Sequence, residues 1–163
     1  MIVTLSTNRK WFCALNTVAR SIGKTVRQLE WLDTFELRVP EIDGDHRVML
    51  DLMKAIQRAA AARDRERVEH CLDRLLAFSQ SHFAREESLL KRWKYPDTKK
   101  HAAYHAGLLA RAETVRQACA KIETPEAFEE CCEEMMSFLV ADVVSGDMKL
   151  KSFLQNAGLV LPV

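Results

Sequence analysis

The sequence predicts an all-α protein, an up-down-up-down four-helix bundle with an extra N-terminal amphipathic helix. Along most of the chain, apolar residues recur at steps of three and four, which is the period of one face of an α-helix. Glycine (5) and proline (4) are both scarce among the 163 residues, so few positions favour a turn. Long helices with short connections fit that scarcity better than a many-stranded sheet does, and four of them form a bundle.

The N-terminal extension covers residues 1–30, and an amphipathic helix is expected from Asn8 to Glu30. Its apolar stripe offers a surface to a protein partner or to a second copy of the chain. Alternatively, the stripe packs against the bundle as a fifth helix. The bundle itself is expected over residues 31–157, followed by a short C-terminal tail over residues 158–163.

The first two helices of the bundle are expected to start near Asp43 and near Asp64. Pro40 is expected to precede the first helix, because proline fits poorly in a helix interior. Asp64 suits the N-cap of the second helix, which is expected to end at Tyr95–Pro96. The apolar face expected for the first helix consists of Val48, Leu52, Ile56 and Ala59.

The last two helices of the bundle have similar start signals. Asp97 or Thr98 is expected to cap the third helix. Thr124–Pro125 is expected to start the fourth, since proline suits the first helical position. Ser145–Gly146 is expected to interrupt this fourth helix before it resumes.

The balance of charge argues against two classes of partner. The chain has 24 basic and 23 acidic residues and a formal net charge of +1, so nucleic acid and an anionic membrane are not expected. No stretch approaches the ~18 uninterrupted apolar residues of a membrane span. The N-terminus lacks the charged start and long apolar core of a signal peptide. We therefore expect a cytoplasmic protein.

The five cysteines form no CxxC pair, and we expect all of them to be reduced thiols. The adjacent Cys131 and Cys132 could respond to oxidants or to soft metals. We favour the simpler interpretation, in which both are small apolar residues of a helix.

The histidines carry the main functional prediction. His101 and His105 are four residues apart on one helix, and His82 and Glu86 have the same spacing on another, so each pair shares a face. His46 lies near the start of the first bundle helix. A single such pair is usually surface or core decoration, but four of the five histidines fall into one pattern on three consecutive helices. His70 alone lies outside the pattern, and we expect it on the surface.

This pattern predicts a metal site inside the bundle. Asp142 and Asp147 on the fourth helix add two carboxylates to the four histidines and Glu86. Four imidazoles with carboxylates suit iron, whereas a structural zinc site would use cysteine or fewer ligands. Carboxylates that bridge two metal ions are common in dinuclear iron sites of helix bundles.

At this point the sequence resembles the bacterial hemerythrin family, from Trp31 to Leu154. The resemblance begins with W-x-x-x-F-x-L-x-V-P-E-I-D-x-x-H, which ends at His46. It continues with H-F-x-x-E-E from His82, with Y-P at residues 95–96, and with H-x-x-x-H from His101. Few unrelated chains would carry all four motifs in this order.

The resemblance implies two non-haem iron ions in an Fe–O–Fe type centre that binds molecular oxygen. In that family's pattern one iron is held by the residues that match His46 and His82, and the other by those that match His101 and His105. Glu86 and Asp147 would bridge the pair. The family binds oxygen in an apolar pocket, for which the candidates are Leu50 and Leu89; core packing explains these leucines equally well.

One position departs from the family pattern. Where the family has H-x-x-x-x-D, this chain has D-V-V-S-G-D, so Asp142 stands in place of the last histidine. Either Asp142 replaces that ligand, which we favour, or its side chain is too short and water takes the position. An added carboxylate favours the ferric state, so a coordinating Asp142 predicts a readily oxidised site.

The spacing of the two aspartates makes a further prediction. Five residues along an ideal helix turn by about 500°, which leaves Asp142 and Asp147 roughly 140° out of register. A local distortion of the helix must bring both carboxylates to one centre, and Ser145–Gly146 is the expected place.

The leading functional hypothesis is an oxygen or redox sensor with a readily oxidised di-iron site, with no catalytic residue assigned. The first alternative is a di-iron enzyme that reduces oxygen, peroxide or nitric oxide, for which only Tyr104 and the carboxylates offer a proton. The second is a metal-free helical interaction module.

Overall fold

A computed structural model describes residues 33–142 and 146–160 of the chain. The N-terminal helix expected from Asn8 to Glu30 lies outside these residues. A short 3-10 helix, η1 (Asp33–Phe35), leads into the first long helix of the bundle. Within the described residues, no helix is both long enough and apolar enough to cross a membrane.

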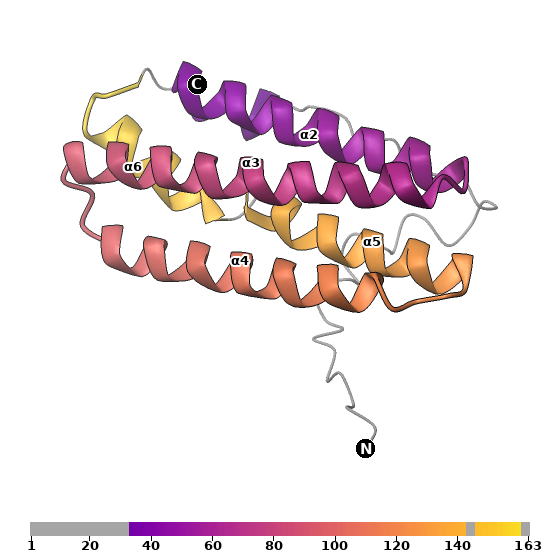
Figure 1. Cartoon of the computed structure of the whole chain (residues 1–163). Coiled ribbons are helices and arrows are strands. Elements are labelled where there is room, and N and C mark those ends of the chain that lie inside the picture. The colour runs from indigo at the N-terminus through magenta and orange to yellow at the C-terminus, as the bar shows by residue number, and fades with distance from the viewer. Residues whose placement is uncertain (1–32, 143–145, 161–163) are drawn as a thin grey trace, which may run out of the picture.

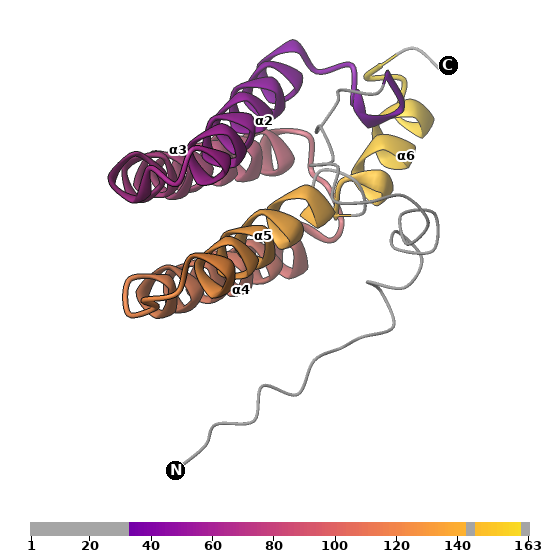
Figure 2. The same ribbon diagram turned by 90° about the vertical axis from the view of Figure 1, so that its right-hand side faces the viewer.

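Four long helices lie side by side and alternate in direction (Figure 1), and these are α2 (Pro40–Ala61), α3 (Arg65–Arg92), α4 (Thr98–Cys119) and α5 (Pro125–Ala141). A shorter helix, α6 (Met148–Asn156), follows α5. The view along the bundle shows two layers, one of α2 with α3 and one of α4 with α5 (Figure 2). Sequential helices pack on one another, and α5 closes the ring against α2. The predicted all-α four-helix bundle is therefore confirmed.

Most predicted helix starts agree with the structure. The Asp64 side chain accepts a hydrogen bond from the backbone N–H of Arg67 at 3.0 Å and so caps α3. Asp97 is the N-cap residue of α4, although its side chain makes no capping hydrogen bond. Helix α5 begins at Pro125, as predicted.

The predicted start of the first bundle helix is wrong by one turn, because α2 begins at Pro40 rather than near Asp43. Proline is tolerated at the first helical position, where its missing N–H would have no partner inside the helix. Asp43 lies inside the helix instead, and its Oδ1 accepts a hydrogen bond from the backbone N–H of Leu37 at 2.8 Å. This buried bond fixes the direction in which the chain enters the bundle.

The apolar interior is divided into two clusters. The larger apolar cluster fills the half of the bundle that contains the α2–α3 and α4–α5 connections, and it consists of Met49, Leu52, Met53, Ile56, Ala59, Val68, Cys71, Leu72, Leu75, Phe83, Leu108, Ala112, Val115, Cys119, Phe128, Cys132, Met135 and Met136. The smaller apolar cluster lies at the other end, where α6 meets the start of α2 and the end of α3, and it consists of Leu37, Val39, Ile42, Leu89, Leu90, Tyr95, Leu150 and Leu154.

The predicted apolar face of α2 was only partly right. Leu52, Ile56 and Ala59 are buried as expected, but Val48 is 43% exposed. The buried stripe of α2 is centred on Met49 and Met53, which the prediction left out. Val48 lies beside that stripe, because residues one position apart on a helix differ by about 100° in direction.

The predicted distortion between Asp142 and Asp147 is confirmed, although Ser145, one of the two residues at its expected place, lies outside the described residues. Helix α5 ends at Ala141 and α6 begins at Met148. The backbone N–H of Asp147 donates to the carbonyl of Asp142 at 3.2 Å, which spans five residues instead of four. A π-helical turn contains more residues than an α-helical turn, so residues five apart lie closer to one face than they would in an α-helix.

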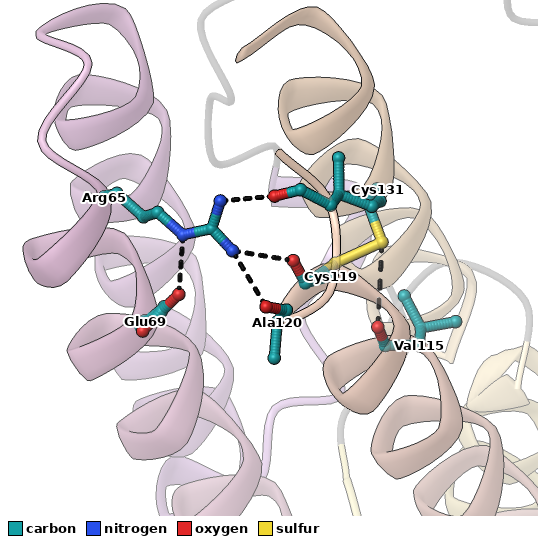
Figure 3. The surroundings of a disulfide bond; sticks show 7 residues. Arg65, Glu69, Val115, Cys119, Ala120 and Cys131 are labelled. Atoms are coloured by element: carbon teal, nitrogen blue, oxygen red, sulfur yellow. Dashed lines mark hydrogen bonds and ion pairs between the residues drawn. A yellow bond between two sulfur atoms is a disulfide. The ribbon is translucent and has the colours of Figure 1, made fainter. Parts of the chain in front are cut away.

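The prediction that all cysteines are reduced is wrong for one pair. Cys119 at the end of α4 and Cys131 in α5 form a disulfide, with their Cα atoms 5.7 Å apart (Figure 3). The short α4–α5 connection places these residues opposite each other, a juxtaposition that the sequence spacing did not indicate. Cys71 and Cys132 are free and buried, and Cys13 lies outside the described residues.

Arg65, at the start of α3, holds the same end of the bundle together. Its guanidinium donates to the backbone carbonyls of Cys119 and Ala120, each at 3.1 Å, and to that of Ile122 (Figure 3). These carbonyls lie at the C-terminus of α4, where helical carbonyls have no partner within the helix. The guanidinium also lies 4.5 Å from the ring centre of Phe128.

Candidate metal centre

A layer of buried polar side chains separates the two apolar clusters. On α2 and α3, residues of the smaller cluster lie toward the end of the bundle next to α6, and most residues of the larger cluster lie toward the opposite end. We call this set the polar layer, and it consists of the seven residues His46, His82, Glu86, His101, His105, Asp142 and Asp147, none more than 8% exposed. These are the seven ligand candidates that the sequence singled out, and the structure brings all of them together.

The polar layer is buried because its members lie on the same helix stripes as the apolar core. On α4, His101 and His105 are followed on one stripe by Leu108 and Ala112, at steps of three and four residues. The same holds on α2, where His46 precedes Met49. Helix packing therefore carries the imidazoles into the interior together with the core residues.

Glu86 lies at the centre of the layer, between histidines from two helices. Its Oε1 lies 2.7 Å from Nε2 of His101, and its Oε2 lies 3.5 Å from Nε2 of His82 and 3.9 Å from Nε2 of His105. The ligand atoms of His46, His82 and Glu86 lie within 4.8 Å of one another, and so do those of Glu86, His101 and His105. Glu86 thus belongs to two groups of ligand atoms at once.

Asp147 also lies between the two groups. Its Oδ2 is 3.3 Å from Nε2 of His46, and its Oδ1 is 3.9 Å from Nε2 of His101. The carboxylate therefore faces histidines of both groups, as Glu86 does. A carboxylate in this position can bind two cations with its two oxygens.

Asp142 directly follows α5 and faces α4. It is fully buried, and its Oδ1 lies 3.9 Å from Nε2 of His105. Gly146 makes this position accessible, because a Cβ atom on residue 146 would lie only 2.7 Å from Oδ1 of Asp142. The same Cβ would lie 3.1 Å from Cε1 of Tyr104. The helix glycine at the distortion therefore leaves room for the Asp142 carboxylate.

The polar layer fits a bound metal because its own groups do not satisfy one another. Among the described residues, the carboxylate oxygens of Glu86, Asp142 and Asp147 and the Nε2 atoms of all four histidines are buried without a hydrogen-bond partner. His101 Nε2 and Glu86 Oε1 are close, but they are not aligned as a hydrogen bond. Each unsatisfied buried polar group costs about 1–3 kcal/mol. A cation that accepts these lone pairs removes that cost, and imidazoles with carboxylates suit iron.

Burial keeps two of the imidazoles neutral and ready to donate a lone pair. It lowers the pKa of His46 to about 3 and that of His105 to about 4, although the charge of Glu86 opposes the shift at both. Glu86 behaves differently from a carboxylate buried alone. Burial raises its pKa, but the surrounding imidazoles, His101 first, outweigh burial and leave the pKa lowered.

The pKa values of the two aspartates are raised, because a buried layer without a metal disfavours several ionised carboxylates. Burial, reinforced by the charge of Glu86, raises the pKa of Asp142 to about 8 and raises that of Asp147 as well. Three carboxylates in one buried layer repel one another when all are ionised. A bound cation would offset this repulsion. The electrostatics of the layer and its unsatisfied polar atoms therefore both favour a bound cation.

Two further carboxylates contact the polar layer and were not found from the sequence. Oδ2 of Asp45 lies 3.2 Å from Nδ1 of His82, and Oε1 of Glu87 lies 3.3 Å from Nδ1 of His105. In the sequence, Asp45 directly precedes His46 and Glu87 directly follows Glu86. That adjacency was visible in the sequence, but it did not indicate which imidazole each carboxylate would reach.

The remaining predicted residues lie around the layer. Leu89 is buried in the smaller apolar cluster, and Leu50 is partly buried on α2. Tyr104 is 39% exposed, and burial together with the charges of Asp142 and Asp147 raises its pKa to about 12. His70 is exposed on α3, as predicted.

Comparisons with known proteins agree with this site. The family profile of the hemerythrin HHE cation binding domain matches residues 38–154. The chain is also similar to a bacteriohemerythrin of Stenotrophomonas maltophilia (strain R551-3), with 24% identity over 119 residues, covering 73% of this chain and 76% of that protein. The matched region contains the whole polar layer, and such a domain binds iron. This metal-binding, all-helical chain therefore belongs to the hemerythrin family.

Proposed function

We propose that this protein binds molecular oxygen at a non-haem di-iron centre and acts as an oxygen or redox sensor whose site oxidises readily. One observation supports the proposal above the others: Glu86 is shared by two groups of buried ligand atoms, each with two histidines. Iron bound in this layer supplies oxygen binding and the change between ferrous and ferric states.

The residues of the polar layer take distinct roles in this proposal. His46 and His82 hold one iron, and His101 and His105 hold the other. Glu86 and Asp147 bridge the two, in keeping with their positions between histidines of both groups. Leu50 and Leu89 line the oxygen pocket. The N-terminal extension, residues 1–30, passes the state of the site to a protein partner or to a second copy of the chain.

Asp142 favours sensing over oxygen transport. We propose that it holds iron beside His105, since its buried carboxylate faces that imidazole and makes no hydrogen bond among the described residues. A third carboxylate adds a negative charge to the centre, and negative charge stabilises the ferric ion over the ferrous ion. A protein that stores oxygen needs a long-lived ferrous site, whereas a sensor can use its oxidation.

Iron analysis and visible spectra of the anaerobically reduced protein, before and after air, test the di-iron centre. We expect about two irons per chain, in line with the two ligand groups, and an absorption band of oxo-bridged ferric iron after aeration. A preparation reconstituted with ferrous iron that retains none would leave the interaction module as the better hypothesis. Multiple turnovers of oxygen, peroxide or nitric oxide with an electron donor would favour the enzyme.

The substitution Asp142→His tests the sensing hypothesis. We expect autoxidation to slow by at least about tenfold, which corresponds to a change of about 1.4 kcal/mol in the activation free energy. The interaction between two unit charges 4 Å apart near a protein surface is larger, roughly 4 kcal/mol, so loss of the Asp142 charge can account for this change. Asp142→Asn keeps the shape and removes the charge, so it should slow oxidation as well. An unchanged or faster rate in both variants would contradict the role of charge.

A further inference from the structure

Two histidines of the polar layer each have a carboxylate beside the ring nitrogen Nδ1. Nδ1 of His82 lies 3.2 Å from Asp45 Oδ2, and Nδ1 of His105 lies 3.3 Å from Glu87 Oε1. The other ring nitrogen of each histidine, Nε2, faces Glu86. One such carboxylate–imidazole pair occurs in each of the two groups of ligand atoms.

The arrangement matters because a neutral imidazole has one N–H and one lone pair. Both rings are buried, and the Nδ1 atom of each lies within hydrogen-bonding distance of a carboxylate. An ionised carboxylate is only an acceptor, so a carboxylate beside Nδ1 requires the proton to sit on Nδ1. The lone pair is then left on Nε2, the atom that faces the centre of the layer.

Both carboxylate–imidazole pairs are fixed by a second contact. Arg85 donates to Oδ2 of Asp45 from Nε and from Nη2, each at 2.8 Å, so Asp45 is held across the α2–α3 interface. The ring of His105 stacks on Phe83, with ring centres 3.9 Å apart and an angle of 10° between the planes. The His105 ring is therefore oriented by stacking, and the carboxylate beside the His82 ring is held in place by an arginine.

We propose that Asp45 and Glu87 are positioning residues, which hold His82 and His105 with the proton on Nδ1 and the lone pair of Nε2 toward the centre. This inference rests on the proposed metal centre for its purpose, but the proton position is a property of the chain alone. Carboxylates in this relation to a ligand histidine fix its orientation and strengthen its lone pair as a metal donor.

Nitrogen-15 NMR of the histidine rings in the metal-free full-length chain tests the proton position directly. In the wild type, His82 and His105 should both carry the proton on Nδ1. Asp45→Ala should move the proton of His82 toward Nε2 and leave His105 unchanged, and Glu87→Ala should do the reverse. A general loosening of the fold would not produce this reciprocal pattern. A wild-type proton on Nε2, or variants without the ring-specific shift, would overturn the inference.

Arg85→Gln separates the two contacts of Asp45. It removes the arginine that holds Asp45 but leaves the carboxylate free to accept from His82. We expect the His82 proton to remain on Nδ1. If Arg85→Gln and Asp45→Ala shift the His82 ring equally, Asp45 acts through its ion pair and the inference is wrong.

Iron release from the loaded protein to a strong ferrous chelator, under anaerobic conditions, provides a second measurement. Asp45→Ala and Glu87→Ala should each release iron about 10–100-fold faster than the wild type. Asp73→Ala is the matched control, because Asp73 also accepts from an arginine of a neighbouring helix, Arg116, but its histidine neighbour is the exposed His70 and not a member of the polar layer. Release at the rate of this control would overturn the inference. A wild type that takes up no iron would instead defeat the proposed function, while the NMR result would still decide the proton positions.

Discussion

The larger apolar cluster and the polar layer lie next to each other in the bundle interior but are built in opposite ways. The larger apolar cluster is made of side chains that satisfy one another by packing, and it is closed by the Cys119–Cys131 disulfide and by Arg65. The polar layer beside it consists of groups that leave their lone pairs unsatisfied. Burying a large apolar side chain contributes about 1.5–3 kcal/mol, whereas each unsatisfied polar group costs about 1–3 kcal/mol. The larger apolar cluster thus stabilises the fold that holds the candidate ligands of the polar layer in place.

The comparison predicts that the centre can be destroyed without unfolding the bundle. Glu86→Gln removes the charge of the one residue shared by both groups of ligand atoms while it keeps the side-chain volume. We expect iron content to fall from about two per chain to near zero, because both ions lose a charged ligand. Helix content measured by circular dichroism should stay unchanged. A variant that kept both irons would show that Glu86 is not a bridging ligand.

The opposite result, a loss of stability with the iron content unchanged, is expected when the larger apolar cluster loses its disulfide. Cys119→Ser removes a cross-link between residues separated by 12 positions. The free energy of unfolding should fall by about 3 kcal/mol, because the unfolded chain regains the entropy of that loop. Chemical denaturation measures this change, and iron content should remain that of the wild type. With a thiol reductant present, the wild type and the variant should have nearly the same free energy of unfolding, because neither contains the disulfide. If the variant were still less stable, the loss would come from packing of the serine and not from the missing cross-link.

Gly146→Ala adds one methyl group at the edge of the polar layer. The new methyl group would lie 2.7 Å from Oδ1 of Asp142, so the carboxylate must move. We expect a loss of about 1–3 kcal/mol in stability and slower autoxidation, in the direction of Asp142→Asn. Gly107→Ala on α4 is the matched control, since a Cβ there meets nothing within 4 Å. Because alanine is the better helix former, this control should be neutral or more stable by up to about 1 kcal/mol.

The pH dependence of iron binding should reveal which groups release protons. Burial raises the pKa of Asp142 to about 8, so this carboxyl is protonated in the metal-free protein at neutral pH and must lose its proton to bind iron. The pKa values of His46 and His105, about 3 and about 4, leave these rings already neutral. Apparent affinity should therefore rise as pH increases from 6 to 8, by up to about tenfold per pH unit for each proton released.

Titration of the metal-free protein with ferrous iron at several pH values measures this slope. Asp142→Asn should flatten it, with Asp147 and His101 left as further sources of a proton, since the pKa of each is raised as well. A slope that is equally steep in the variant would mean that Asp142 does not exchange its proton for iron.

The bundle helices and the candidate ligands were predictable from the sequence because both depend on local spacing. Histidines four residues apart share a helix face whatever surrounds the helix. The N-cap of Asp64 and the start of α5 at Pro125 likewise follow from backbone rules that involve one or two residues. Even the distortion between Asp142 and Asp147 followed from counting degrees along a helix.

Only the tertiary structure decided which residues from different helices meet. The Cys119–Cys131 disulfide and the contacts of Asp45 with His82 and of Glu87 with His105 each depend on how neighbouring helices are rotated and aligned. Periodicity defines a stripe on each helix but not which stripe residue lies at its centre, and for this reason Val48 was expected inside and lies 43% exposed. The sequence by itself determined which groups could bind a metal; packing determined how those groups are oriented and what holds them.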